Sequence, residues 1–148
     1  MVTHSNAKLP RGLRNNNPLN IRKNPNNNWQ GAEKGSDPEF ETFANCVWGV
    51  RAAFIIIRNY LKNPKLPAKT IAGIIARWAP PSENNTSAYI SRVCQLAFVN
   101  ANDKADFANK AMMCSLVKAM IIVENGKQYE SFVPSSSIER AYDMATGR

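Results

Sequence analysis

Histidine and cysteine are scarce in this 148-residue sequence, and their scarcity argues against several kinds of active site. The one histidine, His4, lies in a polar N-terminal stretch, so we expect neither a Ser-His-Asp triad nor a histidine-based metal site. The three cysteines are widely spaced and form no Cys-x-x-Cys pair, which argues against a zinc site and a disulfide framework. Each lies in an apolar helical pattern, where cysteine packs as a small core residue: Cys46, Cys94 and Cys114. The sequence therefore predicts no metal and no cofactor.

Long apolar runs are also missing. The longest, from Ala52 to Ile57, is far shorter than the roughly 20 residues that a membrane-spanning helix needs. Residues 1–9 contain no apolar segment of the kind found in signal peptides. We therefore expect no membrane insertion. The prediction is a protein made in the cytoplasm that acts in the periplasm or on the cell wall, delivered as a phage product or by a secretion machine.

Acidic residues are few, with eleven against nineteen basic ones, which gives a formal net charge of +8. This excess favours a polyanionic partner, whether nucleic acid, a membrane surface or an acidic cell-wall polymer. The basic residues are scattered and no nucleic-acid-binding motif is present, so a nucleic-acid-binding module is the weakest of these interpretations and we expect no specific nucleic acid. The length and composition predict a flexible N-terminus over residues 1–10 and a single domain over residues 11–148.

An asparagine-rich segment, Arg11-Gly-Leu-Arg-Asn-Asn-Asn-Pro-Leu-Asn-Ile-Arg22, is the most unusual stretch of the chain. Asparagine side chains bond to nearby backbone and Pro18 restricts the residue before it, so a helix interior is excluded here. We expect a fixed turn that presents amide groups between arginines. Such a turn suits a polyhydroxylated, N-acetylated or anionic ligand, and Asn17, Asn20 and Arg22 are the candidate binding residues. The alternative is an ordinary polar surface loop.

The rest of the chain predicts a mainly α fold (α+β) with a small antiparallel hairpin or three-stranded sheet near the N-terminus. Turn-forming residues separate three short extended segments: 20–22, 29–32 and 40–43. Apolar periodicity then predicts these helices: a buried central one over 47–61, one over 71–78 capped by Thr70, one starting at Asn85 or Thr86, one or two within 104–124, and a last one over 136–146 with a Ser136–Glu139 capping box and a stop at Gly147.

Glu124 is the first candidate catalytic residue. It continues an apolar helical stripe and precedes Asn125-Gly126, which is a helix stop, so it lies in the last turn of a helix. Apolar neighbours and the negative end of the helix dipole both disfavour the ionised carboxylate, and we therefore expect a raised pKa. A raised pKa suits a general acid at neutral pH. The alternative is a frayed helix end at which Glu124 simply reaches water.

Glu83 is the second candidate, in a polar loop just before a predicted helix, where it suits a role as base or positioning carboxylate. The alternative is an ordinary acidic residue at a helix start. Tyr89 and Trp78 are aromatic residues nearby that could line a cleft or belong to the core. Carboxylates around an amide-rich groove, without a catalytic histidine, metal cluster or phosphate loop, indicate cleavage of a glycosidic bond.

The chain resembles a family of small phage-associated proteins with a lysozyme-like fold. The resemblance covers most of the chain and rests on these blocks: Arg14-Asn-Asn-Asn-Pro-Leu-Asn-Ile-Arg22, Asn28-Trp-Gln-Gly31, Phe40 with Phe43, Trp48-Gly-Val-Arg-Ala52, Arg77-Trp-Ala-Pro-Pro-Ser-Glu-Asn-Asn-Thr86, Ala88-Tyr-Ile90 and Val123-Glu-Asn-Gly126. The order of blocks is similar to that of flagellar-type muramidases and lytic transglycosylases, but rotated. A circular permutation would explain this order, because chain ends often lie close together.

The resemblance implies roles for individual residues. Glu124 matches the catalytic acid and Tyr89 matches the cleft tyrosine. Asn17, Asn20 and Trp29 match the binding groove. Together with Arg22, Gln30 and Tyr89 they are the substrate-binding candidates. Leu19 departs from the family, which usually has a glycine there, and the match fixes no second catalytic carboxylate. A lytic transglycosylase, which needs one acid/base, and a hydrolase with Glu83 as partner therefore both stay open.

Two hypotheses of different classes follow. The first is a peptidoglycan-cleaving glycosidase that acts on the bond between N-acetylmuramic acid and N-acetylglucosamine, with glycan strands as its partner. The second is a non-catalytic virion or baseplate protein that keeps the lysozyme-like fold and binds cell-wall glycan. Both allow contacts with phage tail, virion or secretion-machine components. They differ in whether soluble fragments are released from the wall.

Overall fold

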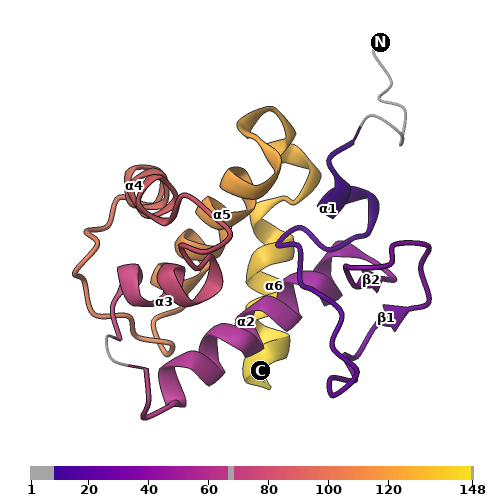
Figure 1. The fold of residues 1–148 in the computed structure, drawn as a ribbon, viewed down its shortest axis with the longest axis horizontal. Coiled ribbons are helices and arrows are strands. Elements are labelled where there is room, and N and C mark those ends of the chain that lie inside the picture. The colour runs from indigo at the N-terminus through magenta and orange to yellow at the C-terminus, as the bar shows by residue number, and fades with distance from the viewer. Residues whose placement is uncertain (1–8, 67–68, 148) are drawn as a thin grey trace.

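Helices dominate the computed structural model, which describes residues 9–66 and 69–147 (Figure 1). In chain order the elements are α1 (Arg11–Arg14), β1 (Ala32–Glu33), β2 (Thr42–Phe43), α2 (Cys46–Lys62), α3 (Ile71–Trp78), α4 (Thr86–Ala97), α5 (Lys110–Asn125), the 3-10 helix η2 (Lys127–Phe132) and α6 (Ser135–Thr146). The predicted fold class, mainly α with a small antiparallel β element near the N-terminus, is confirmed. Of the predicted flexible N-terminus, residues 1–8 lie outside the described part of the chain.

Helix α2 is the central helix that the sequence predicts, and it crosses the molecule in contact with α6 (Figure 1). Val50, Ala52, Ala53, Phe54 and Ile57 of this helix are fully buried. The ring of Phe54 meets the ring of Tyr142 on α6 edge-on, with 5.4 Å between the ring centres. The helix begins where the Asn45 side chain accepts a hydrogen bond from the Trp48 amide, and it ends before Pro64, whose ring disfavours helical backbone in the preceding residue.

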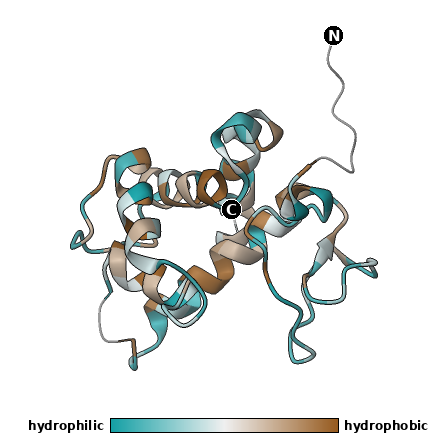
Figure 2. Cartoon of the chain, turned by 45° about the horizontal axis from the view of Figure 1, so that its top comes forward, coloured by the Kyte–Doolittle hydropathy of each residue, from teal (hydrophilic) through white to brown (hydrophobic). Residues whose placement is uncertain are grey.

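The other long helices complete the core around α5, which packs against both α4 and α6. The predicted caps are confirmed at Thr70, which accepts from the Gly73 amide, and at Asn85, which accepts from the Ala88 amide. The segment predicted to hold one or two helices contains one, α5, and its cap is Asn109. The apolar faces of these helices turn inward, whereas the loops around the small sheet are mostly hydrophilic (Figure 2).

The start of the last helix differs from the prediction. Helix α6 begins one residue early, at Ser135, with Pro134 at the capping position and no side-chain cap. Ser136 therefore lies inside the first turn, and the predicted Ser136–Glu139 capping box does not form. The predicted stop is confirmed, because Gly147 ends α6 in the left-handed conformation with φ of 78°.

The β element is a two-stranded antiparallel sheet in which Ala32 pairs with Phe43 and Glu33 with Thr42. The first of the three predicted extended segments contributes only one bridge, between Arg22 and Phe40. The sheet is therefore smaller than a full three-stranded one. No helix among residues 9–66 and 69–147 has the length and apolar character to cross a bilayer.

Two glycines allow the asparagine-rich turn to approach the helices closely. A Cβ at Gly49 on α2 would collide with the Asn16 carbonyl oxygen. A Cβ at Gly12 would lie 2.8 Å from the Asn17 carbonyl oxygen and 2.9 Å from Asn20 Oδ1. All three contacts are shorter than a Cβ tolerates, so glycine at these two positions is what lets the turn lie between α2 and the end of α5.

Candidate active site

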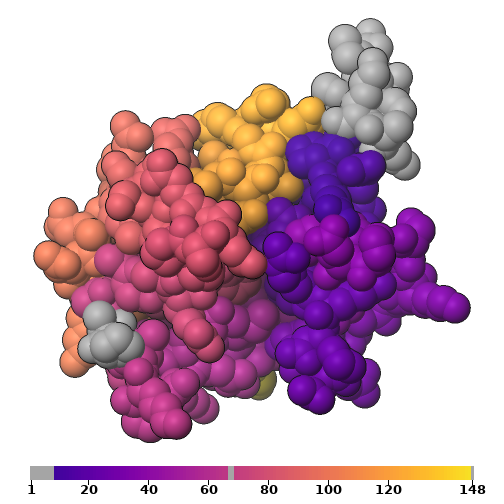
Figure 3. Space-filling model, in the orientation of Figure 1, coloured from indigo at the N-terminus to yellow at the C-terminus, as the bar shows by residue number. Residues whose placement is uncertain are grey.

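A groove runs between the asparagine-rich turn and the loop that joins α3 to α4. Its deeper part has a volume of about 310 Å³, and an adjoining part of about 370 Å³ shares four of its residues. In Figure 3 it lies where the indigo N-terminal region faces the pink region around residue 80. The deeper part is lined by Arg11, Leu19, Asn20, Arg22, Phe40, Trp78, Ala79, Glu83, Asn84 and Glu124.

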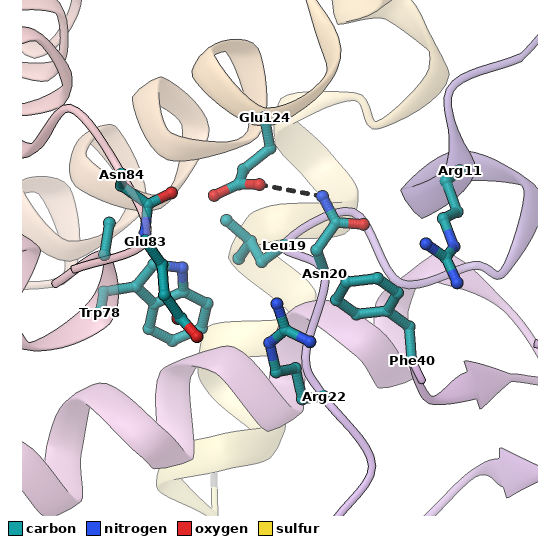
Figure 4. A pocket seen from close by; sticks show the side chains of 10 residues that line it. Arg11, Leu19, Asn20, Arg22, Phe40, Trp78, Glu83, Asn84 and Glu124 are labelled. Carbon is teal, nitrogen blue, oxygen red and sulfur yellow. Dashed lines mark hydrogen bonds between the residues drawn. The ribbon is translucent and has the colours of Figure 1, made fainter. Parts of the chain in front are cut away.

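Glu124 lies in the last turn of α5, as predicted, and its carboxyl group reaches the groove (Figure 4). Both carboxyl oxygens accept a hydrogen bond. Asn20 Nδ2 donates to Oε1 at 2.9 Å, and the Tyr89 hydroxyl donates to Oε2 at 2.9 Å. These bonds join three segments that are far apart in the sequence: the asparagine-rich turn, α4 and α5.

Burial raises the pKa of Glu124 above its ordinary value, and this cause outweighs the hydrogen bonds that act in the other direction. Asn20 and Tyr89 lower the pKa by donating to the carboxylate, and the side chain of Trp78 lowers it as well. The predicted direction of the shift is therefore confirmed, with burial as its main cause. All these donors are neutral. Among the described residues, no positively charged group in contact with Glu124 therefore favours loss of its proton.

Tyr89 is itself buried, with 8% of its surface exposed. Burial first, and then the neighbouring Glu124, raise the pKa of the Tyr89 hydroxyl far above its ordinary value. The hydroxyl therefore stays protonated and donates to Glu124 across the whole range in which the carboxyl group titrates. Tyr89 is therefore a fixed donor to Glu124, although it is not among the residues that line the groove.

The position of Asn20 is set by the turn that carries it. Asn20 adopts the left-handed conformation with φ of 54°, which asparagine tolerates better than most residues. Asn17 holds this turn from inside: its Nδ2 donates to the carbonyl oxygens of Ile21 and Glu41, each at 2.9 Å. Asn125, next to Glu124, ties the turn to α5 by donating to the Pro18 carbonyl oxygen at 2.7 Å.

Arginines and a phenylalanine form the wall on the side of the small sheet. The guanidinium carbons of Arg11 and Arg22 lie 4.5 and 5.0 Å from the centre of the Phe40 ring. Arg11 also holds Asp37 through two hydrogen bonds, of 2.6 Å from Nε and 2.7 Å from Nη2. Glu39 lies 3.4 Å from each arginine, with one oxygen toward Arg11 and the other toward Arg22.

Asp37 is a buried carboxylate that the sequence did not identify as part of this region. The bonds from Arg11 hold its pKa well below the usual range, helped by the backbone amides of Glu39 and Phe40 and by the side chain of Asn15, all of which outweigh burial. Asp37 therefore stays ionised and keeps Arg11 in place.

The opposite wall comes from the end of α3 and the loop that follows it. Trp78, Glu83 and Asn84 project toward the groove from this side (Figure 4). Glu83 is exposed and lines both parts of the groove. It lies in a turn ahead of α4, with its amide bonded to the Pro80 carbonyl oxygen at 3.0 Å. The groove thus holds one half-buried carboxyl group and one exposed one.

The structure brings together five of the residues proposed from the sequence, with Glu124, Asn20 and Tyr89 in direct contact and Arg22 and Glu83 lining the same groove. Three others lie elsewhere. Asn17 is fully buried and its side chain bonds only to backbone groups of Ile21 and Glu41, Trp29 packs against the core, and Gln30 is exposed and does not line the groove.

Asn17, Trp29 and Gln30, which the sequence offers as substrate-binding candidates, are not among the residues that line this groove. The Asn17 side chain stabilises the turn, because it pairs backbone groups of Ile21 and Glu41 that this irregular segment would otherwise leave without a hydrogen bond. Phe40 and Asn84 line the groove instead. Both belong to sequence blocks that carry the family resemblance, which was the available signal for them.

No group of three or more histidine, cysteine, aspartate or glutamate side chains is placed to hold a metal ion in the described part of the chain.

No model of a known protein family matches the sequence. Protein P5 of Pseudoalteromonas phage PM2 is 43% identical over 119 residues, which cover 78% of this chain and 71% of that protein. The chain belongs to the P5 family. Membership of the P5 family links the chain to bacteriophage, and the name of that protein states no activity.

Proposed function

We propose that the chain is a peptidoglycan-cleaving glycosidase that acts on the bond between N-acetylmuramic acid and N-acetylglucosamine. The observation that carries the proposal is the carboxyl group of Glu124, which is half-buried in a groove, has a raised pKa and is held by the neutral donors Asn20 and Tyr89. A carboxyl group in this state keeps its proton at higher pH and can give it to the leaving oxygen of a glycosidic bond.

The rest of the groove supports a polymeric sugar as the ligand. The two adjoining parts form one elongated depression, and each has the volume of a small-molecule site. The amides of Asn20 and Asn84 suit hydroxyl and acetamido groups, and the rings of Trp78 and Phe40 offer flat apolar surfaces to sugar rings. The net charge of +8 would attract the protein to an anionic wall.

Two reaction types fit this site. With Glu124 as the only acid/base, the hydroxyl group of the muramic acid itself attacks, and the product carries an anhydro-muramyl end, as in a lytic transglycosylase. With Glu83 as the second carboxylate, water attacks and the product has a reducing end. Only Glu124 is half-buried and bonded by two donors, which favours the transglycosylase.

Digestion of purified peptidoglycan, followed by mass spectrometry of the released muropeptides, tests the proposal. The wild-type chain should release fragments, and Glu124→Gln should release none while keeping its fold. Anhydro-muramyl ends would establish the transglycosylase, and reducing muramic ends the hydrolase. Equal release by the wild type and Glu124→Gln would contradict the role of Glu124.

A non-catalytic phage virion protein that binds cell-wall glycan is the second candidate. The similarity to a phage protein favours it, and so does the engagement of both Glu124 oxygens, which a purely structural carboxylate would also show. This candidate predicts that the folded wild-type chain sediments with purified sacculi and releases no soluble fragment. Such a result would replace the first proposal.

A further inference from the structure

Arg11 and Arg22 are held as a pair on the two sides of one aromatic ring. Their guanidinium carbons lie 4.5 and 5.0 Å from the centre of the Phe40 ring, and both side chains line the groove that contains Glu124. Asp37 fixes Arg11 through two short bonds, and stacking restricts Arg22. Arginine held in this way presents N–H groups in a fixed plane, the geometry that suits a carboxylate.

Glu39 already shows that the pair accepts a carboxylate. Its two oxygens are divided between the arginines, each 3.4 Å from the nearest guanidinium nitrogen. These distances are long for charge-assisted hydrogen bonds, and 55% of the Glu39 side chain and 60% of the Arg22 side chain are exposed. Glu39 is therefore held weakly and can turn into the solvent.

We infer that Arg11 and Arg22 form a subsite for a carboxylate on the glycan, so that the groove prefers anionic strands to neutral ones. This inference rests on the proposed function, because it concerns the substrate of the same groove. Muramic acid carries a lactyl carboxyl group, which is free in peptide-free strands. In complete strands that group is joined to a stem peptide, which brings carboxylates of its own. Chitin oligosaccharides consist of N-acetylglucosamine alone and have no carboxylate.

Glu39 opposes this subsite with its negative charge. Arg11 is already neutralised by Asp37, so Arg22 supplies the remaining positive charge for an incoming carboxylate, and Glu39 cancels it. Removal of the Glu39 charge should therefore strengthen the binding of anionic glycan. This gives the inference a variant that gains affinity as well as one that loses it.

Binding is measured in the Glu124→Gln background, where cleavage does not interfere, by titration calorimetry with soluble peptidoglycan strands and with chitin oligosaccharides. Arg22→Ala should weaken binding of the strands about tenfold, the loss expected for a charge-assisted hydrogen bond, and leave chitin binding unchanged. Glu39→Gln should strengthen binding of the strands alone. Arg22→Lys should restore part of the affinity, because it returns the charge without the planar fork.

Arg51→Ala is the matched control. Arg51 stacks on Trp48 at 6.0 Å and is not among the residues that line the groove, so this variant removes the same charge from a similar stack. It should leave the preference for anionic strands unchanged. An equal loss in Arg51→Ala and Arg22→Ala would overturn the subsite, because net charge alone would then explain the effect.

Two further comparisons separate the possible outcomes. Stronger binding of strands freed of their peptides by an amidase than of stem-bearing strands would assign the lactyl carboxyl group, which is free only after the peptide is removed. A loss of affinity on peptide removal would assign a stem-peptide carboxylate. If the wild type releases muropeptides but Arg22→Ala keeps the full preference, the subsite is wrong and the proposed function stands. If Arg22→Ala loses the preference but the wild type releases nothing, the subsite stands and the cleavage fails.

Discussion

Glu124 and Asp37 are both carboxylates that accept a hydrogen bond from an asparagine side chain, yet their pKa values are shifted in opposite directions. Glu124 has only neutral donors, Asn20 and Tyr89, and burial raises its pKa. Asp37 has the guanidinium of Arg11, which holds its pKa far below the ordinary value. The comparison shows that the charge of one partner decides whether a buried carboxylate can act as an acid or serves as a fixed anchor.

The two carboxylates also make opposite contributions to the pH dependence of stability. A raised pKa means that the folded state holds the proton more tightly than the unfolded one, so the contribution of Glu124 is complete below its ordinary pKa of 4.5 and is lost as pH rises through the raised value. A lowered pKa has the reverse effect. The contribution of Asp37 is complete above its ordinary pKa of 3.8 and is lost as pH falls toward the lowered value.

The largest effect is expected from Glu124→Gln. Muropeptide release should fall by about 10²- to 10⁴-fold, the contribution of a general acid, while thermal unfolding at pH 7 shows no loss of stability, because glutamine has no charge to bury. Glu130→Gln is a suitable control, since Glu130 pairs with Lys127 and Lys118 away from the groove. A clear loss of stability in Glu124→Gln would make this carboxylate an anchor like Asp37.

Asp37→Asn should have the opposite profile, with its main effect on stability. Arg11 keeps its charge and loses its anionic partner, so the Tm at pH 7 should fall. The part of the acid-induced loss of stability that comes from Asp37 should also disappear, which is visible as a smaller change in Tm between pH 6 and pH 3. An unchanged Tm at both pH values would show that the ion pair contributes nothing to the fold.

Tyr89→Phe should widen the difference between the pKa of Glu124 and the pKa of Asp37. The variant removes a neutral donor that lowers the pKa of Glu124, so the pKa of this carboxyl group should rise further. If Glu124 is the general acid, the alkaline limb of the pH–rate profile should shift upward by the same amount. A shift toward lower pH would mean that the Tyr89 hydroxyl does not stabilise the ionised form.

Glu83→Gln should have the smallest effect on stability, within about 0.5 kcal/mol, because Glu83 is exposed and has neither the burial of Glu124 nor the ion pair of Asp37. Its effect on activity separates the two reaction types. A transglycosylase that relies on Glu124 should keep most of its rate, whereas a hydrolase that uses Glu83 should lose it. Muropeptide release by Glu83→Gln and by Glu124→Gln, measured side by side, distinguishes the transglycosylase from the hydrolase.

The position of Glu124 could be predicted from the sequence because it depends on local signals. Helical spacing places it on an apolar face, and Asn125-Gly126 ends the helix directly after it. Burial then raises its pKa, in the predicted direction. The helix caps at Thr70 and Asn85 depend on equally local patterns and were predicted as well.

The roles of the individual asparagines could not be predicted, because they depend on which way each side chain faces in the folded turn. Asn15 bonds Asp37, Asn16 bonds the Phe43 carbonyl oxygen, Asn17 is buried in the turn, and only Asn20 reaches Glu124. Four residues of one type within six positions give no local signal for these assignments. The Arg11–Asp37 pair spans 26 positions and was missed for the same reason.

The bond between Asn20 and Glu124 joins residues that are 104 positions apart, and the turn that carries Asn20 is tied to α5 through Asn125. During translation the first of these partners leaves the ribosome long before the second. A nascent chain therefore cannot form this carboxyl site until α5 has emerged, and a prematurely terminated chain never forms it. Protein synthesis itself would then delay the appearance of any lytic activity until nearly the whole domain can fold.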